Sequence, residues 1–449
     1  MRQVRAAAET VLDRVPRTER GGPLALTVGL SGGIDSVVLL DVLCLIARDR
    51  ALSISALHVH HGLSPNADAW VRFCTRACAI AGVPLAVHVV KVETGASVES
   101  RARDARLRAF REAAGRWIAL AHHLNDQAET VLLRLLRGAG VAGLAAMRAV
   151  QMPRPVDPRA VVRPLLGVSR EQIAAYASAR KLGWVVDESN ERDAFRRNFL
   201  RLRVFPVMER RFPGFPERLA RTAAHMAEAA DLLDALAALD RRAVARRAGL
   251  DVAALGRLGR LRAKNVLRAA VQRAGERPPD AVRLEQALDQ LLTAGTDRHP
   301  AIMLGALLLH RRGGCAALLP ARNPAPPDWS MKWDRSGTTR MDDLGGEVRV
   351  RRTAGAGIAI RLCNGPDWAF RLRQGGERFR PDADRPARTL KNLLRESDIA
   401  AGTRGQLPLL FAGDRLVWVP GIGVAVGWQA KAGESGIVPV WRRDSEKRR

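Results

Sequence analysis

The chain has 449 residues, of which 47% are hydrophobic and 27% are charged, so it has apolar side chains for two or three folded domains and is not wholly disordered. Lysine and arginine together number 73 against 46 acidic residues, and only seven of the 73 are lysine, which gives a formal net charge of +27. An arginine excess of this size favours a polyanionic partner because guanidinium groups match phosphate geometry, although a GC-rich genome also enriches arginine.

Strand and helix patterns alternate over the first two hundred residues. Apolar runs predict buried strands at 24–30, 53–60, 84–90 and 117–123. Helical patterns follow them in turn at 37–47, 66–81, 97–115 and 125–137. Because parallel strands need crossover helices, this order predicts an α/β domain with a doubly wound parallel sheet, which we assign to residues 1–212.

The rest of the chain has other patterns. From 215 to 292 apolar residues recur with a period of 3.6 and strand patterns are almost missing, which predicts a small helical domain over residues 213–318. Proline-rich sequence begins a linker with short strands, assigned to residues 319–366. Short alternating runs then predict a C-terminal module of mixed α/β structure over residues 367–449.

Two further features concern the compartment. No run of 18 apolar residues occurs, so we expect no membrane span, and the first twenty residues have the pattern of an amphipathic helix rather than of a targeting peptide. The five cysteines include no CxxC pair, so we expect neither a disulfide framework nor an iron–sulfur site. These features predict a cytoplasmic protein.

The sequence SGGIDS, at residues 31–36, stands between the first predicted strand and its helix. Gly32 and Gly33 allow close approach of the backbone to a ligand, Ser31 and Ser36 add hydroxyl groups, and a helix that begins near Asp35 offers free N–H groups. Together these groups predict a phosphate cradle. The loop has neither the Gly-Lys-Ser/Thr of a Walker A motif nor a GxGxxG motif, and a simple tight turn is the alternative.

A strand, an SGGxDS loop and a helix in this order resemble the PP-loop ATP pyrophosphatases. The resemblance implies that ATP is bound by the loop residues Ser31, Gly32, Gly33, Ile34, Asp35 and Ser36. Asp35 is the only acid of the loop, and the resemblance implies that it holds Mg²⁺ against the phosphates, because that ion prefers hard oxygen ligands.

The stretch AHHLNDQAET, which begins at residue 121, is similar to the tRNA(Ile)-lysidine synthases, which attach lysine to the wobble cytidine of an isoleucine tRNA. Asp126 and Glu129 are three residues apart, so both carboxylates project from one helix face. The resemblance implies that they bind lysine and that Asp126 is catalytic, since a carboxylate can accept a proton from the attacking amine. A capping box has the same spacing, and this chain has Asn125 where the family often has a second acid.

Other segments have the same family pattern in the same order. HVHHGLSPNADAW at 58–70, SVESRARDARLRAF at 97–110, VVRPLL at 161–166 and DESNERDAFRRNFLR at 187–201 all match it. The resemblance implies that Arg106 is catalytic and faces the ATP phosphates, and that Arg163, Arg197 and Asn198 contact nucleic acid. Residues 375–425 resemble the C-terminal module of the longer members, with a basic face formed by Arg378, Arg380, Arg385, Arg388, Lys391 and Arg395.

The resemblance therefore implies a ligase that forms a carbon–nitrogen bond. ATP adenylates oxygen 2 of the wobble cytidine in tRNA(Ile) with a CAU anticodon, and the lysine ε-amine then attacks carbon 2 and expels AMP. A PP-loop tRNA thiolase is an alternative, but the chain has no paired cysteines for it. A non-catalytic tRNA-binding protein is another, against which Asp35, Asp126 and Glu129 argue. The sequence does not determine the oligomeric state, for which a homodimer is one option.

Overall fold

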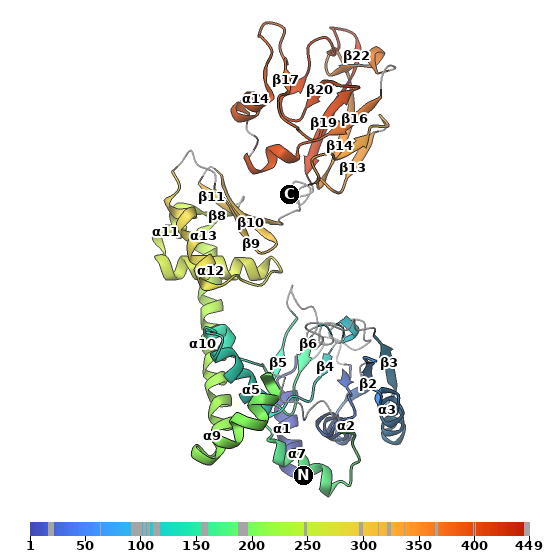
Figure 1. Ribbon diagram of the computed structural model, residues 1–449, viewed down its shortest axis with the longest axis vertical. Coiled ribbons are helices and arrows are strands. Elements are labelled where there is room, and N and C mark those ends of the chain that lie inside the picture. Colours follow the sequence, from blue (N-terminus) through green and yellow to red (C-terminus); the bar gives the residue numbers. More distant parts are fainter. Residues whose placement is uncertain are drawn as a thin grey trace. The chain divides into compact units, whose positions relative to one another are not determined.

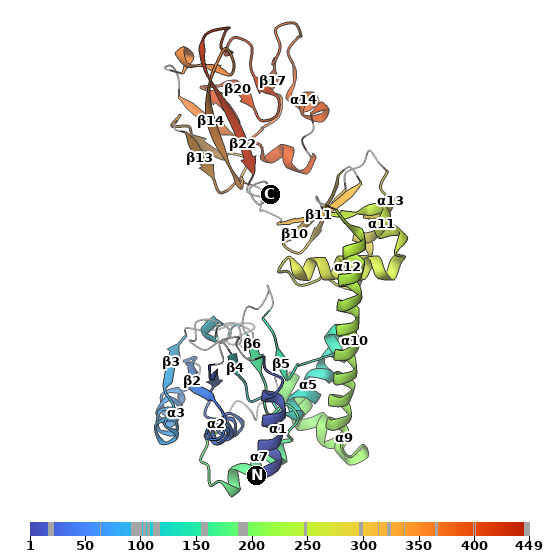
Figure 2. The same cartoon turned by 180° about the vertical axis from the view of Figure 1, so that it is seen from behind.

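The computed structural model describes residues 1–16, 22–62, 64–90, 101, 105, 108–110, 117–153, 160–186, 196–246, 249–295, 300–312, 314–320, 325–335, 337–363, 367–397, 399 and 401–443. The chain divides into two compact units (Figures 1 and 2). The first comprises Met1–Asp240 with Gln272–Arg277, and the second comprises Arg241–Val271 with Pro278–Arg449. No helix in the described part of the chain is both long and apolar enough to cross a membrane.

A six-stranded sheet lies at the centre of the first unit, in the order β3-β2-β1-β4-β6-β5. Its strands are β1 (Leu24–Gly29), β2 (Leu52–His60), β3 (Leu85–Val89), β4 (Trp117–Ala119), β5 (Val150–Gln151) and β6 (Ala160–Val162). All neighbours are parallel except β5, which runs antiparallel to β6 at the edge. The predicted parallel α/β fold is confirmed, although the apolar runs did not predict the short strands β5 and β6.

Helices cover this sheet. They are α1 (Arg2–Leu12), α2 (Ile34–Ala47), α3 (Ala67–Ala81), α5 (Leu124–Leu135), α6 (Val141–Leu144) and α7 (Arg170–Ala179). Helix α2 is apolar on most of its circumference because it packs between the sheet and the helices α1 and α7. The helix predicted at 97–115 falls largely outside the described residues.

A run of helices follows the sheet in the first unit: α8 (Arg196–Phe199), the π-helix η2 (Leu200–Val204), α9 (Phe205–Arg211) and the long α10 (Phe215–Val244). Leu200, Phe205 and Phe215 pack with Ala128 of α5, and the rings of Phe205 and Phe215 meet edge to face at 4.7 Å. This packing holds α8 and η2 against α5. Helix α10 begins just after the predicted boundary at residue 212 and continues past Asp240, where the first unit ends, into the second unit.

The second unit begins with helices and a small antiparallel sheet. The helices are α11 (Val252–Arg257), α12 (Arg260–Arg273) and α13 (Ala281–Thr293). The sheet has the order β7-β8-β11-β10-β9, with β7 (Ala245–Arg246), β8 (Gly249–Asp251), β9 (Ala301–Leu304), β10 (Leu307–Arg312) and β11 (Cys315–Pro320). Periodicity predicted the helices but not this sheet, because two of its strands are only two or three residues long.

The C-terminal part consists of further antiparallel sheets and few helices. One sheet joins β12 (Ser330–Lys332), β16 (Trp368–Arg371), β19 (Leu409–Ala412), β20 (Arg415–Val419) and β21 (Gly423–Val424). A second joins β13 (Thr338–Met341), β14 (Gly346–Ala354), β22 (Ser435–Arg443) and β15 (Ile358–Ala359), and a hairpin joins β17 (Arg378–Phe379) and β18 (Arg388–Thr389). The helical turns are η3 (Ile360–Leu362), α14 (Leu390–Glu396) and η4 (Ala401–Gln406).

The predicted linker over 319–366 differs from the structure. Strands β12 to β15 come from it, yet β12 pairs with β16, and both β14 and β15 pair with β22. Trp333 from the same stretch packs edge to face on Trp368 at 5.5 Å. These strands therefore belong to the C-terminal module, and the linker interpretation failed because their partners lie far along the chain.

Candidate active site

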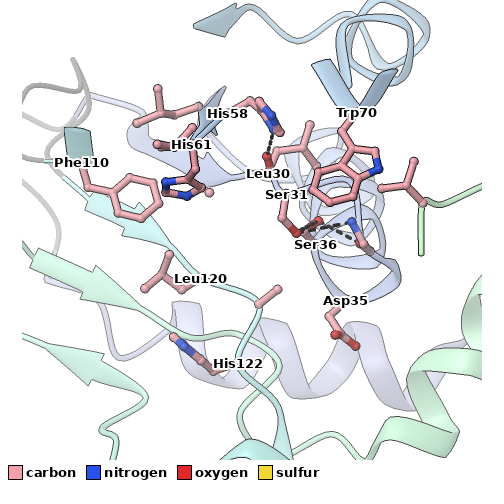
Figure 3. Close-up of a pocket in the computed structure, with 16 residues that line it drawn as sticks. Leu30, Ser31, Asp35, Ser36, His58, His61, Trp70, Phe110, Leu120 and His122 are labelled. Carbon is pink, nitrogen blue, oxygen red and sulfur yellow. Dashed lines mark hydrogen bonds between the residues drawn. The ribbon is translucent and has the colours of Figure 1, made fainter. Parts of the chain in front are cut away.

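A pocket of about 440 Å³ lies at the carboxyl ends of β1, β2 and β4. In the order β3-β2-β1-β4, the chain adds β2 and β3 on one side of β1 and then places β4 on the other side. Ligands of doubly wound sheets bind where the strand order reverses in this way. Figure 3 shows Ser31, Ser36 and Trp70 close together, and Phe110 beside His61 across the pocket. The pocket thus has a polar end at the loop and an apolar end lined by Leu57, Val59, Phe110 and Leu120.

The loop after β1 is held in shape by its own hydrogen bonds. The Gly32 N–H donates to Ser36 Oγ at 3.2 Å, and Ser36 Oγ donates to the Gly33 carbonyl at 2.8 Å. Ser31 Oγ lies 3.1 Å from Ser36 Oγ. Gly32 has a φ of +89°, and a Cβ there would lie 2.9 Å from the side chain of Val185, so no other residue fits this position. The predicted loop residues are therefore brought together at the start of α2 in the geometry of an anion cradle.

The buried His58 side chain holds the backbone at the start of the loop. Its Nδ1 donates to the Leu30 carbonyl at 2.8 Å, directly before Ser31, and the ring is 3% exposed. Burial lowers the pKa of His58, although the bond to Leu30 opposes this effect. A neutral His58 therefore fixes the backbone at the point where β1 becomes the loop.

Asp35 lies in the first turn of α2 and faces the pocket. Its Oδ1 is buried without a hydrogen-bond partner among the described residues, and His123 Nε2 lies 3.8 Å from it. Burial raises the pKa of Asp35 above its usual value, with the Asp126 charge adding to the rise and His123 opposing it. An unpaired carboxylate oxygen beside a phosphate cradle has the chemistry that a hard cation such as Mg²⁺ needs.

Asp126 and Glu129 project from one face of α5, as predicted, and meet two arginines from the later helices. Glu129 is fully buried; Arg197 Nε donates to its Oε2 at 2.5 Å and Arg201 Nε to its Oε1 at 2.7 Å. The Nη2 atoms of both arginines lie 3.4–3.5 Å from Asp126 Oδ1. Two acids and two arginines thus form a charge-balanced cluster, in which Asp126 keeps a small exposed surface and Glu129 has none.

Asp126 is also bound at the start of the helix. The backbone N–H of His123 donates to Asp126 Oδ2 at 3.1 Å, so the capping box has His123 as the cap and Asp126 three residues on, and not Asp126 as the cap with Glu129 as the sequence spacing suggested. Burial favours the neutral form of Asp126, but the charges of His123 and Arg197 outweigh it and lower the pKa below its usual value. Asp126 therefore remains ionised at neutral pH.

His123 and Arg201 are site residues that we did not assign from the sequence. His123 is 1% exposed and its Nε2 lies between Asp35 Oδ1 at 3.8 Å and Asp126 Oδ2 at 3.5 Å, so it joins the loop to α5. Its signal was the second histidine of the AHH sequence. The signal for Arg201 was its spacing of four residues from Arg197, which places both on one helix face.

The other predicted residues of the first unit have different positions. Arg106 lies outside the described residues, so its role stays a prediction. Arg163 is 8% exposed and its Nη1 donates to the Arg148 carbonyl at 2.8 Å, beneath the β5–β6 hairpin. Asn198 is half-buried on α8, next to Arg197 of the cluster. Arg163 is thus buried, and Asn198 is partly exposed to solvent.

The predicted basic face of the C-terminal module surrounds the β17–β18 hairpin and α14. Arg378 donates to the Ala387 carbonyl at 2.7 Å and Arg380 to the Arg385 carbonyl at 2.9 Å, while Arg388 pairs with Glu396 on α14. These three arginines therefore brace the hairpin. Arg378 and Arg380 are nevertheless exposed, as are Arg385, Lys391 and Arg395, whereas Arg388 is partly buried.

Comparisons with known proteins identify the families that this chain resembles. A PP-loop domain model matches residues 8–208, a TilS substrate binding domain model matches 250–316, and a TilS substrate C-terminal domain model matches 369–444. A tRNA(Ile)-lysidine synthase from Nitrosomonas europaea is 38% identical over 93% of this chain and 91% of its own length. One from Azoarcus sp. is 41% identical over 94% and 92%.

Among solved structures, the U34-tRNA thiolase NcsA from Methanococcus maripaludis, with its 4Fe–4S cluster, aligns with 50% of this chain and 80% of its own. Its TM-score is 0.41 at 17% identity.

Proposed function

This chain belongs to the tRNA(Ile)-lysidine synthase family, and from that membership we propose that it ligates L-lysine to carbon 2 of the wobble cytidine in tRNA(Ile) with a CAU anticodon. The observation that supports this most directly is the placement of a phosphate cradle next to the Asp126 cluster, because the reaction needs ATP and a cationic amine side by side. The function belongs to the carbon–nitrogen ligases.

In the first step, oxygen 2 of the cytidine attacks the α-phosphorus of ATP and pyrophosphate leaves. The N–H groups at the start of α2 and the hydroxyls of Ser31 and Ser36 bind the leaving pyrophosphate, where the positive end of the helix dipole stabilises its charge. The apolar end of the pocket has room and surface for the adenine ring. Arg106 is assigned to the phosphates by resemblance.

Asp35 is the group that fits Mg²⁺, because its buried Oδ1 lacks a partner at the edge of the cradle. Bound there, the ion supplies charge neutralisation for the phosphate oxygens. Burial disfavours the ionised state of Asp35, and a bound cation would offset that cost.

In the second step, the lysine ε-amine attacks carbon 2, the new carbon–nitrogen bond forms, and the carbon–oxygen bond to AMP breaks. Asp126 binds the amine end of lysine as an ionised carboxylate, a state that its lowered pKa favours, and accepts the proton that the nitrogen loses as the new bond forms. Glu129 contributes by holding Arg197 and Arg201, whose Nη2 atoms set the charge around Asp126. Positioning of the amine next to an activated carbon supplies much of the rate.

The second unit and the C-terminal module bind the tRNA in this proposal, in line with the substrate-binding models that match there. Exposed Arg385, Lys391 and Arg395 provide phosphate contacts, whereas Arg378, Arg380 and Arg388 shape the hairpin that presents them. The buried Arg163 and the half-buried Asn198 are assigned to nucleic acid by resemblance.

A thiolase fits the chain less well. The cysteine closest to the loop is Cys74, and burial raises its pKa to about 12. Cys78 is also buried and its pKa is raised to about 11. A thiol nucleophile needs a lowered pKa and access to substrate, so neither residue has thiolase chemistry.

The test uses an unmodified tRNA(Ile) transcript incubated with ATP and lysine, followed by mass analysis of the wobble nucleoside. We expect lysidine, in amounts that depend on both ATP and lysine, and accumulation of adenylated tRNA when lysine is withheld. A transcript that stays unmodified with folded protein, or that gains sulfur, contradicts the proposal.

A further inference from the structure

The cluster that binds Glu129 occupies only one side of the α8–η2 segment. Arg197 and Arg201 reach Glu129, and Leu200 packs on α5, so these residues define the inner face. Phe199, between Arg197 and Arg201 in sequence, is 48% exposed, and Leu202, directly after Arg201, is 42% exposed. Phe199 is not a member of the apolar cluster in which Leu200 packs on α5.

The apolar side chains of this outer face alternate with cations. Arg196, Arg203 and Arg210 are exposed on the same run of helix, and Val207 is 56% exposed. From residue 196 to 221 the chain has eight arginines and two glutamates, and only Arg197 and Arg201 face Glu129. We call the exposed set Phe199, Leu202, Arg203, Val207 and Arg210 the outer stripe.

We propose that the outer stripe is a tRNA-binding surface of the catalytic unit, on which Phe199 stacks an unpaired base of the anticodon loop and Arg203 contacts the RNA backbone. This inference rests on the proposed function and extends it to a surface outside the segments matched by the substrate-binding models, which are 250–316 and 369–444. Arginines interleaved with an exposed aromatic ring have the chemistry that binds single-stranded RNA.

The proposed reaction requires a surface that stacks unpaired bases. An enzyme that modifies a base must take that base out of its stack, and the neighbouring bases then lose a stacking partner. An exposed ring near the site restores it. The outer stripe begins on the helical segment whose arginines Arg197 and Arg201 bind Glu129, and a helix with its side chains is about 10–12 Å across, roughly the length of three stacked nucleotides at about 3.4 Å each.

The experiment compares full-length Phe199→Ala/Arg203→Gln with a matched pair on α3, Ile80→Ala/Arg76→Gln. Both pairs are four residues apart on exposed helix faces of the same unit, and Ile80 is 84% exposed. Binding of tRNA(Ile), of an anticodon stem-loop RNA with CAU and of an acceptor-stem minihelix is measured over a range of salt concentrations. ATP binding, circular dichroism and sedimentation are followed for each protein.

For the outer-stripe variant we expect the Kd for tRNA and for the stem-loop to rise about tenfold, with a salt slope lower by about one and ATP binding unchanged. The outer-stripe variant should bind the minihelix as tightly as wild type does. The α3 variant should bind all three RNAs with wild-type affinity. Phe199→Trp should keep the affinity and Phe199→Leu should lose it, because only the tryptophan retains a ring that stacks.

The proposal is overturned if the outer-stripe variant binds both RNAs as the α3 variant does, or if Phe199→Leu binds as tightly as wild type. A changed sedimentation coefficient with unchanged RNA affinity assigns the stripe to a protein contact and overturns it too. Wild-type protein that binds the stem-loop through Phe199 but makes no lysidine contradicts the proposed function alone. Normal lysidine formation with no effect of either variant contradicts the surface alone.

Discussion

Glu129→Gln tests how the buried cluster works, because it removes one charge and changes the side-chain volume little. Glu129 is fully buried and accepts from the Nε atoms of Arg197 and Arg201 at 2.5 and 2.7 Å. Each charge-assisted bond contributes about 1.5–3 kcal/mol, and the glutamine amide oxygen can still accept one neutral bond. Since both arginines are partly exposed and can turn toward water, we expect the free energy of unfolding to fall by about 2–4 kcal/mol.

The same change has a kinetic consequence. Without the Glu129 charge, both guanidinium groups pair with Asp126 alone, which is already within 3.4–3.5 Å of them. The two arginines then compete more strongly with the lysine ammonium for Asp126. We therefore expect the lysine KM to rise about tenfold, equivalent to about 1.4 kcal/mol. Formation of adenylated tRNA should persist, because the phosphate cradle is formed by other residues.

A double-variant cycle separates this account from simple loss of stability. Arg201→Gln alone and Glu129→Gln/Arg201→Gln together should give a coupling energy of about 1.5–3 kcal/mol in urea unfolding, with a lysine KM for the double variant below that of Glu129→Gln. Strictly additive effects on stability, or a lysine KM that stays at the wild-type value in Glu129→Gln, would refute the reasoning.

Three other predictions concern single positions. Asp35→Asn should raise the melting temperature of the ligand-free protein at neutral pH and abolish pyrophosphate release. Because burial raises the pKa of Asp35, its ionised form disfavours folding above that pKa, and asparagine removes the charge. An unchanged or lower Tm contradicts this. Gly32→Ala should abolish ATP binding, because Gly32 has a φ of +89° and a Cβ there would lie 2.9 Å from the Val185 side chain. Gly33→Ala should fold normally, because a Cβ at Gly33 would lie 3.6 Å from its nearest neighbour. Equal calorimetric ATP affinities in the two variants would argue against the loop geometry. Lys391→Ala should weaken tRNA binding and lower its salt slope by about one without changing stability, whereas Arg380→Ala should lower the Tm because its carbonyl contacts brace the hairpin; filter binding and thermal melts distinguish the two.

The sequence by itself determined the features that depend on neighbours along the chain. The alternation of apolar runs and helical patterns predicted the parallel sheet, because each crossover unit is local. The loop at 31–36 has its geometry from its own serines and glycines, and Asp126 and Glu129 share a face because of the helical repeat. These elements needed no knowledge of distant segments.

Tertiary structure decided the features that depend on residues far apart. Strands β12 to β15 became part of the C-terminal sheets through partners that short alternating runs do not identify. The sequence showed two acids available to a ligand, but Arg197 and Arg201, 68 and 72 residues further on, enclose Glu129 and leave only Asp126 with an exposed edge. Asp35 and His123 likewise approach only across the sheet. A charged side chain that becomes buried on folding needs a partner of opposite charge, and only the packing of the folded chain determines which residue that is.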